Sequence, residues 1–188
     1  MVPNPTPEQP RYVFFFTGPT ACGKSTIAKY VADKLNLTFL EGDDFHPKAN
    51  VEKMHRGEAL TDEDRQGWLE ALREHEYEHP PGEKSLHLIM TCSALKRHYR
   101  DILREGSELA ENMRVRFIFL EAPEEVLTER AKNRKGHFAG PALVHSQFDI
   151  IEGAAPDETD VHTIHVTKPV EEVEKAALET VREILQGA

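Results

Sequence analysis

The 188-residue chain lacks the features that would place it in a membrane or outside the cell. No apolar run approaches the ~18 residues of a membrane-spanning helix, and the run at 12–16, YVFFF, is five residues long. The first ten residues carry neither the basic segment nor the apolar segment of a secretory signal. We therefore expect no membrane partner and no secretion.

Cysteine and positive charge are both in short supply. The two cysteines, Cys22 and Cys92, form no CxxC motif, and so few thiols are typical of a reducing compartment, which predicts a cytoplasmic protein. A net charge of −10 argues against nucleic acid as the main partner. The basic residues concentrate in the segments 96–104 and 130–137. We expect both segments to lie at a site that binds an anion.

Proline is concentrated in the first ten residues, which predicts a disordered or extended tail over 1–10. The residues 11–187 are predicted to form a single domain. Short apolar runs alternate there with helical patterns, which is typical of a three-layer α/β fold with a parallel sheet between helices. Strands are predicted at 12–17, 38–41, 86–92, 115–120 and 161–166, and helices at 24–35, 48–56, 62–77, 96–110, 123–134 and 170–186. Thr61 and Asp64 form a capping box for the helix at 62–77.

A phosphate-binding loop follows the first predicted strand and opens the first predicted helix. Gly18-x-x-x-x-Gly23-Lys24-Ser25 is a complete Walker A pattern, in which backbone N–H groups cradle phosphates. Lys24 is expected to reach the β- and γ-phosphates, and the Ser25 hydroxyl to hold Mg²⁺. For Cys22, inside the loop, the alternatives are a small filler and a redox role. The predicted ATP-binding residues are Gly18, Pro19, Thr20, Ala21, Cys22, Gly23, Lys24, Ser25 and Thr26.

The loop alone leaves a switch, a hydrolase and a transferase open. The chain has no NKxD motif for a guanine base, and its third predicted strand ends in Thr91-Cys-Ser rather than a Walker B aspartate. Strand alternation instead places Glu41 and Asp43 on one side at the carboxyl end of the second strand, where open α/β sheets bind ligands. One carboxylate there can hold Mg²⁺ through water and the other can take the proton of an acceptor hydroxyl. The alternative is a solvated acidic turn.

Two further groups of basic residues have a functional and a structural interpretation. Arg65 heads the apolar stripe of its helix, so it either snorkels to solvent or holds an acidic substrate. Arg130, Arg134 and His137 fall on one helical face if the helix persists, next to Gly136 and Gly140. That pattern predicts a mobile lid over 133–150 which carries arginines to the transition state and excludes water. The alternative is a basic helix end favoured by the helix dipole.

Several short motifs of the sequence resemble those of the gluconokinase family. They are GDDFHPxAN at 42–50, GExLTDxDRxxWL at 57–69, CSALKRHYRD at 92–101, RKGHF at 134–138 and SQF at 146–148. Together they span residues 12 to about 170 in the expected order. They are far more specific than the Walker A loop.

The resemblance implies transfer of the γ-phosphoryl group of ATP to the 6-hydroxyl of D-gluconate. The products are 6-phosphogluconate, for the pentose phosphate route, and ADP. It also implies the shikimate-kinase-like branch of the nucleoside monophosphate kinase fold, with a five-stranded parallel sheet, a helical substrate-binding segment at 44–80 and a homodimer. ATP and Mg²⁺ are the implied cofactors.

The resemblance further implies roles for individual residues. Asp43 orients or deprotonates the acceptor hydroxyl, Lys24 contacts the phosphates, and Arg130 and Arg134 close over them. The residues implied to contact gluconate are Asp43, His46, Arg65, Lys96, His98 and His137. The alternatives for Lys96 and His98 are a solvated helix start and an indirect contact. The chain departs from related kinases at Glu41, where an aspartate is usual, and Asp44 is the alternative to Asp43.

Two other functions remain open at this stage. One is another small-molecule kinase of the same fold, similar to shikimate or nucleotide kinases, which an acceptor panel would distinguish. The other is a non-catalytic ATP-binding regulator. The presence of Lys24, Ser25, Asp43 and the two lid arginines argues against the regulator, because a module without catalysis has no need of them.

Overall fold

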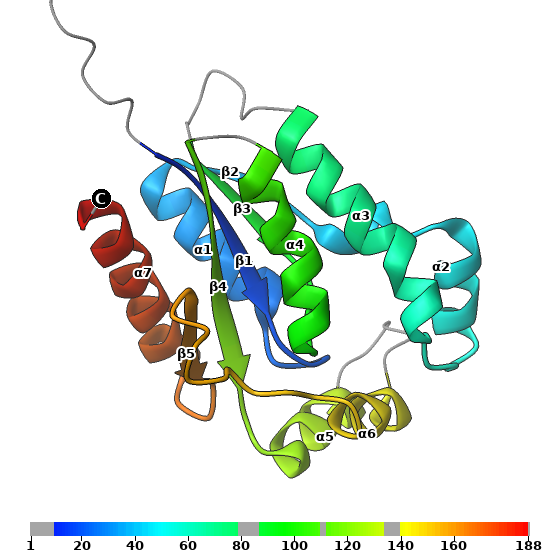
Figure 1. Ribbon diagram of the computed structural model, residues 1–188. Helices are drawn as coiled ribbons and strands as arrows, with labels where there is room; N and C mark the ends of the chain where they lie inside the picture. Colours follow the sequence, from blue (N-terminus) through cyan, green and yellow to red (C-terminus); the bar gives the residue numbers. More distant parts are fainter. Residues whose placement is uncertain (1–9, 79–86, 110–111, 134–139, 188) are drawn as a thin grey trace, which may run out of the picture.

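The computed structural model describes residues 10–78, 87–109, 112–133 and 140–187 (Figure 1). Its five strands form one fully parallel sheet in the order β2-β3-β1-β4-β5, so their carboxyl ends meet at one edge. The strands are β1 (Arg11–Thr17), β2 (Thr38–Leu40), β3 (Leu88–Thr91), β4 (Met113–Glu121) and β5 (Val161–His165). The predicted five-stranded parallel sheet is confirmed.

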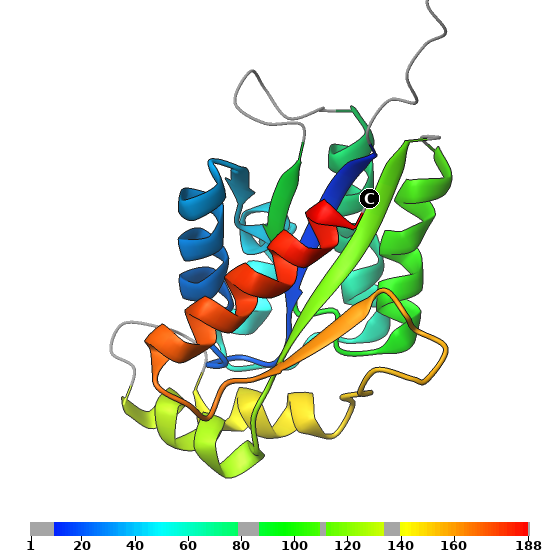
Figure 2. The same ribbon diagram turned by 90° about the vertical axis from the view of Figure 1, so that its left-hand side faces the viewer.

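Helices cover both faces of this sheet. They are α1 (Lys24–Leu35), α2 (Lys48–His55), α3 (Asp62–Glu78), α4 (Arg97–Leu109), α5 (Glu124–Asn133), α6 (Pro141–Phe148) and α7 (Val170–Gln186). Figure 2 shows α1 and α7 on one face and α3 and α4 on the other. α5 and α6 lie beyond the carboxyl ends of the strands (Figure 1).

The continuous apolar run of β1 follows from this sandwich. Phe14 and Phe16 pack into the core beneath α1 and α7, while Val13 and Phe15 pack into the core beneath α3 and α4. Successive side chains of a strand point to opposite faces of the sheet. A strand that is buried on both faces therefore has consecutive apolar residues instead of an apolar–polar alternation. The predicted three-layer architecture is confirmed.

Local signals located most helices to within a few residues. In the capping box, the Asp64 carboxylate accepts the Thr61 N–H at 2.8 Å and the Thr61 hydroxyl accepts the Asp64 N–H at 3.2 Å. Two elements were not predicted: α6 and the 3-10 turn η1 (Gly42–Phe45). Both are short, and α6 begins at a proline that we had assigned to the lid.

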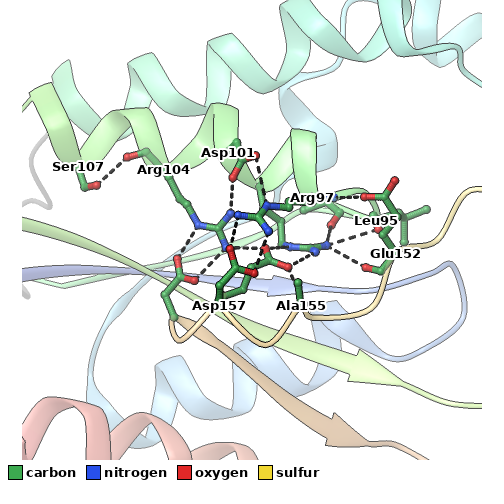
Figure 3. Close-up of polar contacts among 12 residues, drawn as sticks. Leu95, Arg97, Asp101, Arg104, Ser107, Glu152, Ala155 and Asp157 are labelled. Carbon is green, nitrogen blue, oxygen red and sulfur yellow. Dashed lines mark hydrogen bonds and ion pairs between the residues drawn. The ribbon is translucent and has the colours of Figure 1, made fainter.

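The expectation that the segment 96–104 brings positive charge to an anion site is wrong for three of its arginines. Arg97 pairs with Asp157 at 2.7 Å, and Arg104 pairs with its neighbour Asp101 at 2.6 Å (Figure 3). Arg100 is fully buried and pairs with Glu158 at 2.7 Å.

These pairs form a polar network between α4 and the chain that precedes β5. Arg104 also pairs with Glu158 and with Asp160, at 2.7 Å each. The hydrogen bond from Arg100 lowers the pKa of the Glu158 carboxyl to about 2. Charge along the sequence does not reveal the network, because all of its acids except Asp101 lie more than 50 positions downstream of the arginines. The network fastens the 152–160 segment to α4.

The surface of the described residues is mainly polar. Val170 is the exposed large apolar side chain in this part of the chain. Among the described helices, none combines the length and the apolar character needed to cross a bilayer.

Candidate active site

A cavity of about 410 Å³ opens at the carboxyl ends of β1, β2 and β3. The phosphate loop and the start of α1 form one side, and the opposite side comes from η1, α2 and α3. Arg130 of α5 and Leu143 and Gln147 of α6 complete the lining. The cavity therefore joins the predicted phosphate site to the predicted acceptor segment.

Backbone conformation shapes the phosphate loop. Gly18 has φ 131°, and a β-carbon there would overlap the carbonyl oxygen of Leu120. Gly23, with φ 95°, turns the chain into α1, and both angles favour glycine. The loop thus adopts a tight path that a side chain at residue 18 would disrupt.

Most of the predicted ATP-binding residues line the cavity. They are Thr20, Ala21, Gly23, Lys24, Ser25 and Thr26. The Lys24 ammonium group donates hydrogen bonds to the carbonyls of Gly18 and Pro19, at 3.0 and 2.9 Å. Cys22 is 2% exposed and packs behind the loop, as expected of a filler. The assignment of these residues to ATP stays a prediction.

The two predicted carboxylates, Glu41 and Asp43, line the same cavity, although no strand alternation holds them there. β2 ends at Leu40, and η1 turns the chain so that both side chains reach the site. Glu41 accepts a hydrogen bond from the Thr91 hydroxyl, and Asp43 is 65% exposed. Asp44 does not line the cavity, so the geometry favours Asp43 as the carboxylate that meets an acceptor.

Arg65 is a buried cation on the acceptor side. It is 4% exposed and donates to the carbonyls of Leu60 and Thr61. Within the described ranges, no carboxylate lies at ion-pair distance from its guanidinium group. A buried charge without a counter-charge is costly, so this position favours an anionic ligand. The substrate-holding interpretation is thus preferred to snorkelling.

His46 lines the cavity beside Arg65 and stacks on Trp68. The ring centroids are 4.0 Å apart and the ring planes are 15° from parallel. Burial, with a smaller effect of the Arg65 charge, lowers the pKa of His46 to about 4, so the imidazole is neutral at pH 7. Its Nδ1 is buried and has no hydrogen-bond partner among the described residues. A neutral imidazole has one donor and one acceptor nitrogen and can therefore hydrogen-bond a hydroxyl group.

α6 brings a residue that the sequence analysis did not select. Gln147 is 8% exposed, and its side-chain oxygen accepts the N–H of Thr20 in the phosphate loop at 2.6 Å. In the sequence, Gln147 is indicated only by the SQF motif at 146–148. Arg130 reaches the cavity while one of its nitrogens donates to the Val166 carbonyl at 2.6 Å.

The remaining predicted residues lie elsewhere. Lys96 donates to both carboxylate oxygens of Asp62 at 2.8 Å, and His98 is exposed; neither lines the cavity. Arg134 and His137 lie outside the described residues, as do the tail at 1–9 and most of the segment that would link α5 to α6. The lid and these contacts stay predictions.

The cavity has the groups that a nucleotide with Mg²⁺ requires. The loop supplies backbone N–H groups and the Lys24 cation for phosphates, and the Ser25 hydroxyl and Glu41 carboxylate are the oxygen ligands that Mg²⁺ prefers. In the described part of the chain, no cluster of three acidic, histidine or cysteine side chains forms a dedicated metal site.

Comparison with known proteins agrees with this geometry. The sequence model of a family described as an AAA domain matches residues 13–149. The chain is 43% identical to a probable gluconokinase of Schizosaccharomyces pombe, over 97% of this chain and 94% of that protein. It is 37% identical to the thermoresistant gluconokinase of Escherichia coli K12, over 94% and 97%.

A solved structure leads to the same family. The gluconokinase of Sinorhizobium meliloti 1021 superposes with a TM-score of 0.79 at 32% identity, covering 95% of each chain. The similarity to each of these three gluconokinases extends over nearly the whole length of the chain. The chain belongs to the gluconokinase family of P-loop kinases.

Proposed function

We propose that the protein transfers the γ-phosphoryl group of ATP to the 6-hydroxyl of D-gluconate, giving 6-phosphogluconate and ADP. The observation that carries this proposal is a cavity lined both by the phosphate loop and by the buried Arg65, which has no carboxylate at ion-pair distance among the described residues. Gluconate offers a carboxylate for Arg65 and hydroxyl groups for the polar lining. The curated relatives named as gluconokinases support the same acceptor.

The chemistry needs little covalent help from the protein. Phosphoryl transfer passes through a loose transition state, so catalysis rests on positioning and on charge stabilisation. Lys24 and Arg130 supply positive charge on the nucleotide side of the cavity. Bound Mg²⁺ would neutralise charge on the β- and γ-phosphates, with Ser25 as its protein ligand and Glu41 acting through water.

Asp43 acts on the acceptor. With Arg65 holding the carboxylate of gluconate, the distal hydroxyl lies toward the phosphates, where Asp43 orients it and accepts its proton. His46 contributes an uncharged hydrogen-bond partner for a hydroxyl, since its pKa is lowered to about 4. In this arrangement the acceptor side recognises an acid at one end and a polyol along its length.

The test is ADP formation by the purified protein with Mg·ATP and a panel of acceptors. D-gluconate, shikimate, nucleoside monophosphates and a blank without acceptor form the panel. We expect ADP above the blank with gluconate alone. Equal rates with every acceptor, while ATP still binds, would overturn the transferase and favour an ATP-binding regulator.

We further propose that the enzyme works in the cytoplasm, as a homodimer, and supplies 6-phosphogluconate to the pentose phosphate route. Cys22 and Cys92 are both buried and neither forms a disulfide, which supports a reducing compartment. Val170 is the exposed large apolar side chain among the described residues. A dimer interface formed by the described surface would therefore be mainly polar. Sedimentation velocity at several concentrations tests the dimer.

A further inference from the structure

Gly42 lies between the two cavity carboxylates, Glu41 and Asp43, and its backbone is held on both sides. Its N–H donates to the Thr91 hydroxyl at 3.0 Å, at the end of β3. Its carbonyl accepts the indole N–H of Trp68 from α3 at 2.8 Å. A β-carbon at residue 42 would overlap the Thr91 carbonyl oxygen, so the close approach requires glycine. We call Gly42, Thr91 and Trp68 the Gly42 clamp.

Trp68 holds the following turn at a second point. Its ring stacks on His46, the residue directly after η1, with 4.0 Å between the ring centroids. Trp68 is 1% exposed, so its own position is fixed by the core beneath α3. One side chain therefore contacts the start of the turn through a hydrogen bond and its end through ring stacking.

Asp43 lies between these two points and is exposed. Its side chain is 65% exposed, and one of its oxygens is 3.8 Å from the His46 Nε2. Asp43 belongs to the turn η1, so a movement of the Gly42 backbone would move the carboxylate with it. Misplacement of a reacting group by about 1 Å costs on the order of 100-fold in rate.

We propose that Trp68 is a positioning residue for phosphoryl transfer: through the Gly42 clamp and the stack on His46, it fixes the turn that presents Asp43 to the acceptor hydroxyl. This inference rests on the proposed function and adds to it a residue that acts through the Gly42 backbone and the His46 ring. Trp68 acts on the acceptor half of the reaction, because its contacts are with η1 and His46 and not with the phosphate loop.

Trp68→Phe is the variant that tests the proposal. It keeps a ring for His46 and removes the indole N–H that holds Gly42. We expect kcat with gluconate to fall about 10- to 100-fold with the KM for ATP unchanged. Thr180→Val is the matched control, since it also removes one hydrogen bond from a side chain to a backbone carbonyl, at 2.9 Å, but in α7. Unchanged kcat in Trp68→Phe, or an equal loss in Thr180→Val, would overturn the proposal.

A second readout needs no acceptor and separates this proposal from the proposed function. The imidazole chemical shift of His46, assigned with His46→Gln, reports its titration in the presence of the charged neighbours Asp43 and Arg65. Loosening the turn in Trp68→Phe should expose the ring and raise the pKa of His46 from about 4 toward 6.5. If the wild-type protein forms no ADP with gluconate, the proposed function fails, and the titration of His46 still tests whether Trp68 holds the turn. An identical His46 pKa in the two proteins would then count against the clamp.

Discussion

Two buried arginines of this protein have opposite surroundings. Arg100 is fully buried, and its guanidinium meets both oxygens of Glu158, at 2.8 and 2.7 Å, and four backbone carbonyls. Arg65 is 4% exposed, donates to two carbonyls and has no carboxylate at ion-pair distance in the described part of the chain. The first arrangement is complete within the protein, whereas the second leaves positive charge for a ligand. Pairing rather than burial separates a structural arginine from a binding one.

The largest expected effect is on the cavity side, at Asp43. Asp43→Asn should lower kcat by about 10²- to 10⁴-fold, because the amide cannot accept the hydroxyl proton. The KM for ATP should stay near the wild-type value, since the phosphate loop is untouched. Asp44→Asn is the control, as Asp44 is exposed and does not line the cavity. Steady-state kinetics checks both variants, and equal turnover in Asp43→Asn and wild type would remove Asp43 from the mechanism.

The next effect is on stability, at Arg100. Arg100→Met should lower the free energy of unfolding by about 3–5 kcal/mol, because Glu158 would remain buried without its main counter-charge. Adding Glu158→Gln should restore part of that loss, since the uncompensated charge is then gone. Urea unfolding measures both variants. A urea midpoint of Arg100→Met equal to that of the wild type would contradict a structural role for Arg100.

Arg65→Met should give the reverse pattern. Removal of a charged hydrogen-bond donor from the acceptor should lower kcat/KM for gluconate about 10- to 100-fold. The melting temperature should hold or rise, because a buried charge without a counter-charge is removed. Arg97→Met, at an exposed arginine outside the cavity, is the control and should leave kcat/KM unchanged. A large loss of stability in Arg65→Met would show that its charge is already paired.

Acid should weaken the two regions at different pH. The pKa of His46 is lowered from 6.5 to about 4, so the unfolded chain binds more protons between these values and the stability from His46 is lost as pH falls from 6.5 toward 4. The pKa of Glu158 is lowered from 4.5 to about 2, so its contribution is complete above 4.5 and is lost as pH falls toward 2. Urea midpoints measured across this range should lose the upper step in His46→Gln and the lower step in Glu158→Gln. A single step shared by both variants would contradict the separation.

The smallest expected effect is a change in tryptophan fluorescence. Trp68 is the single tryptophan of the chain and lies in the cavity lining, so its emission reports on the acceptor side. Gluconate should change the emission intensity at a fixed ATP concentration, and the change should be weaker in Arg65→Met at the same gluconate concentration. An identical response in Arg65→Met would show that Arg65 does not hold the acceptor.

The sequence predicted what local rules control and missed what depends on distant partners. The apolar run of β1 and the Thr61–Asp64 box specify their elements through neighbours only a few residues away, and both predictions are confirmed. No neighbouring residue indicates the pairing of Arg100, because Glu158 lies 58 positions away and reaches it only through the fold.

The site divides along the same line. The phosphate loop is a continuous pattern and could be located from the sequence to the residue. Gln147 could not be selected, because its contact with Thr20 depends on α6 packing against a loop 127 positions earlier. For Arg65 the sequence supports two interpretations equally, and they are separated by the burial of the side chain together with the lack of a carboxylate partner among the described residues.

The close fit at Gly42 also sets limits for anyone who wishes to redesign this enzyme for a new acceptor. Residue 42 tolerates no side chain, so the spacing of the two carboxylates beside it is a fixed part of the scaffold. Met54 and Leu60 line the same cavity, whereas the contacts that hold the turn come from Thr91 and Trp68. A library that varies these two positions can reshape the acceptor space while the reactive geometry is inherited unchanged.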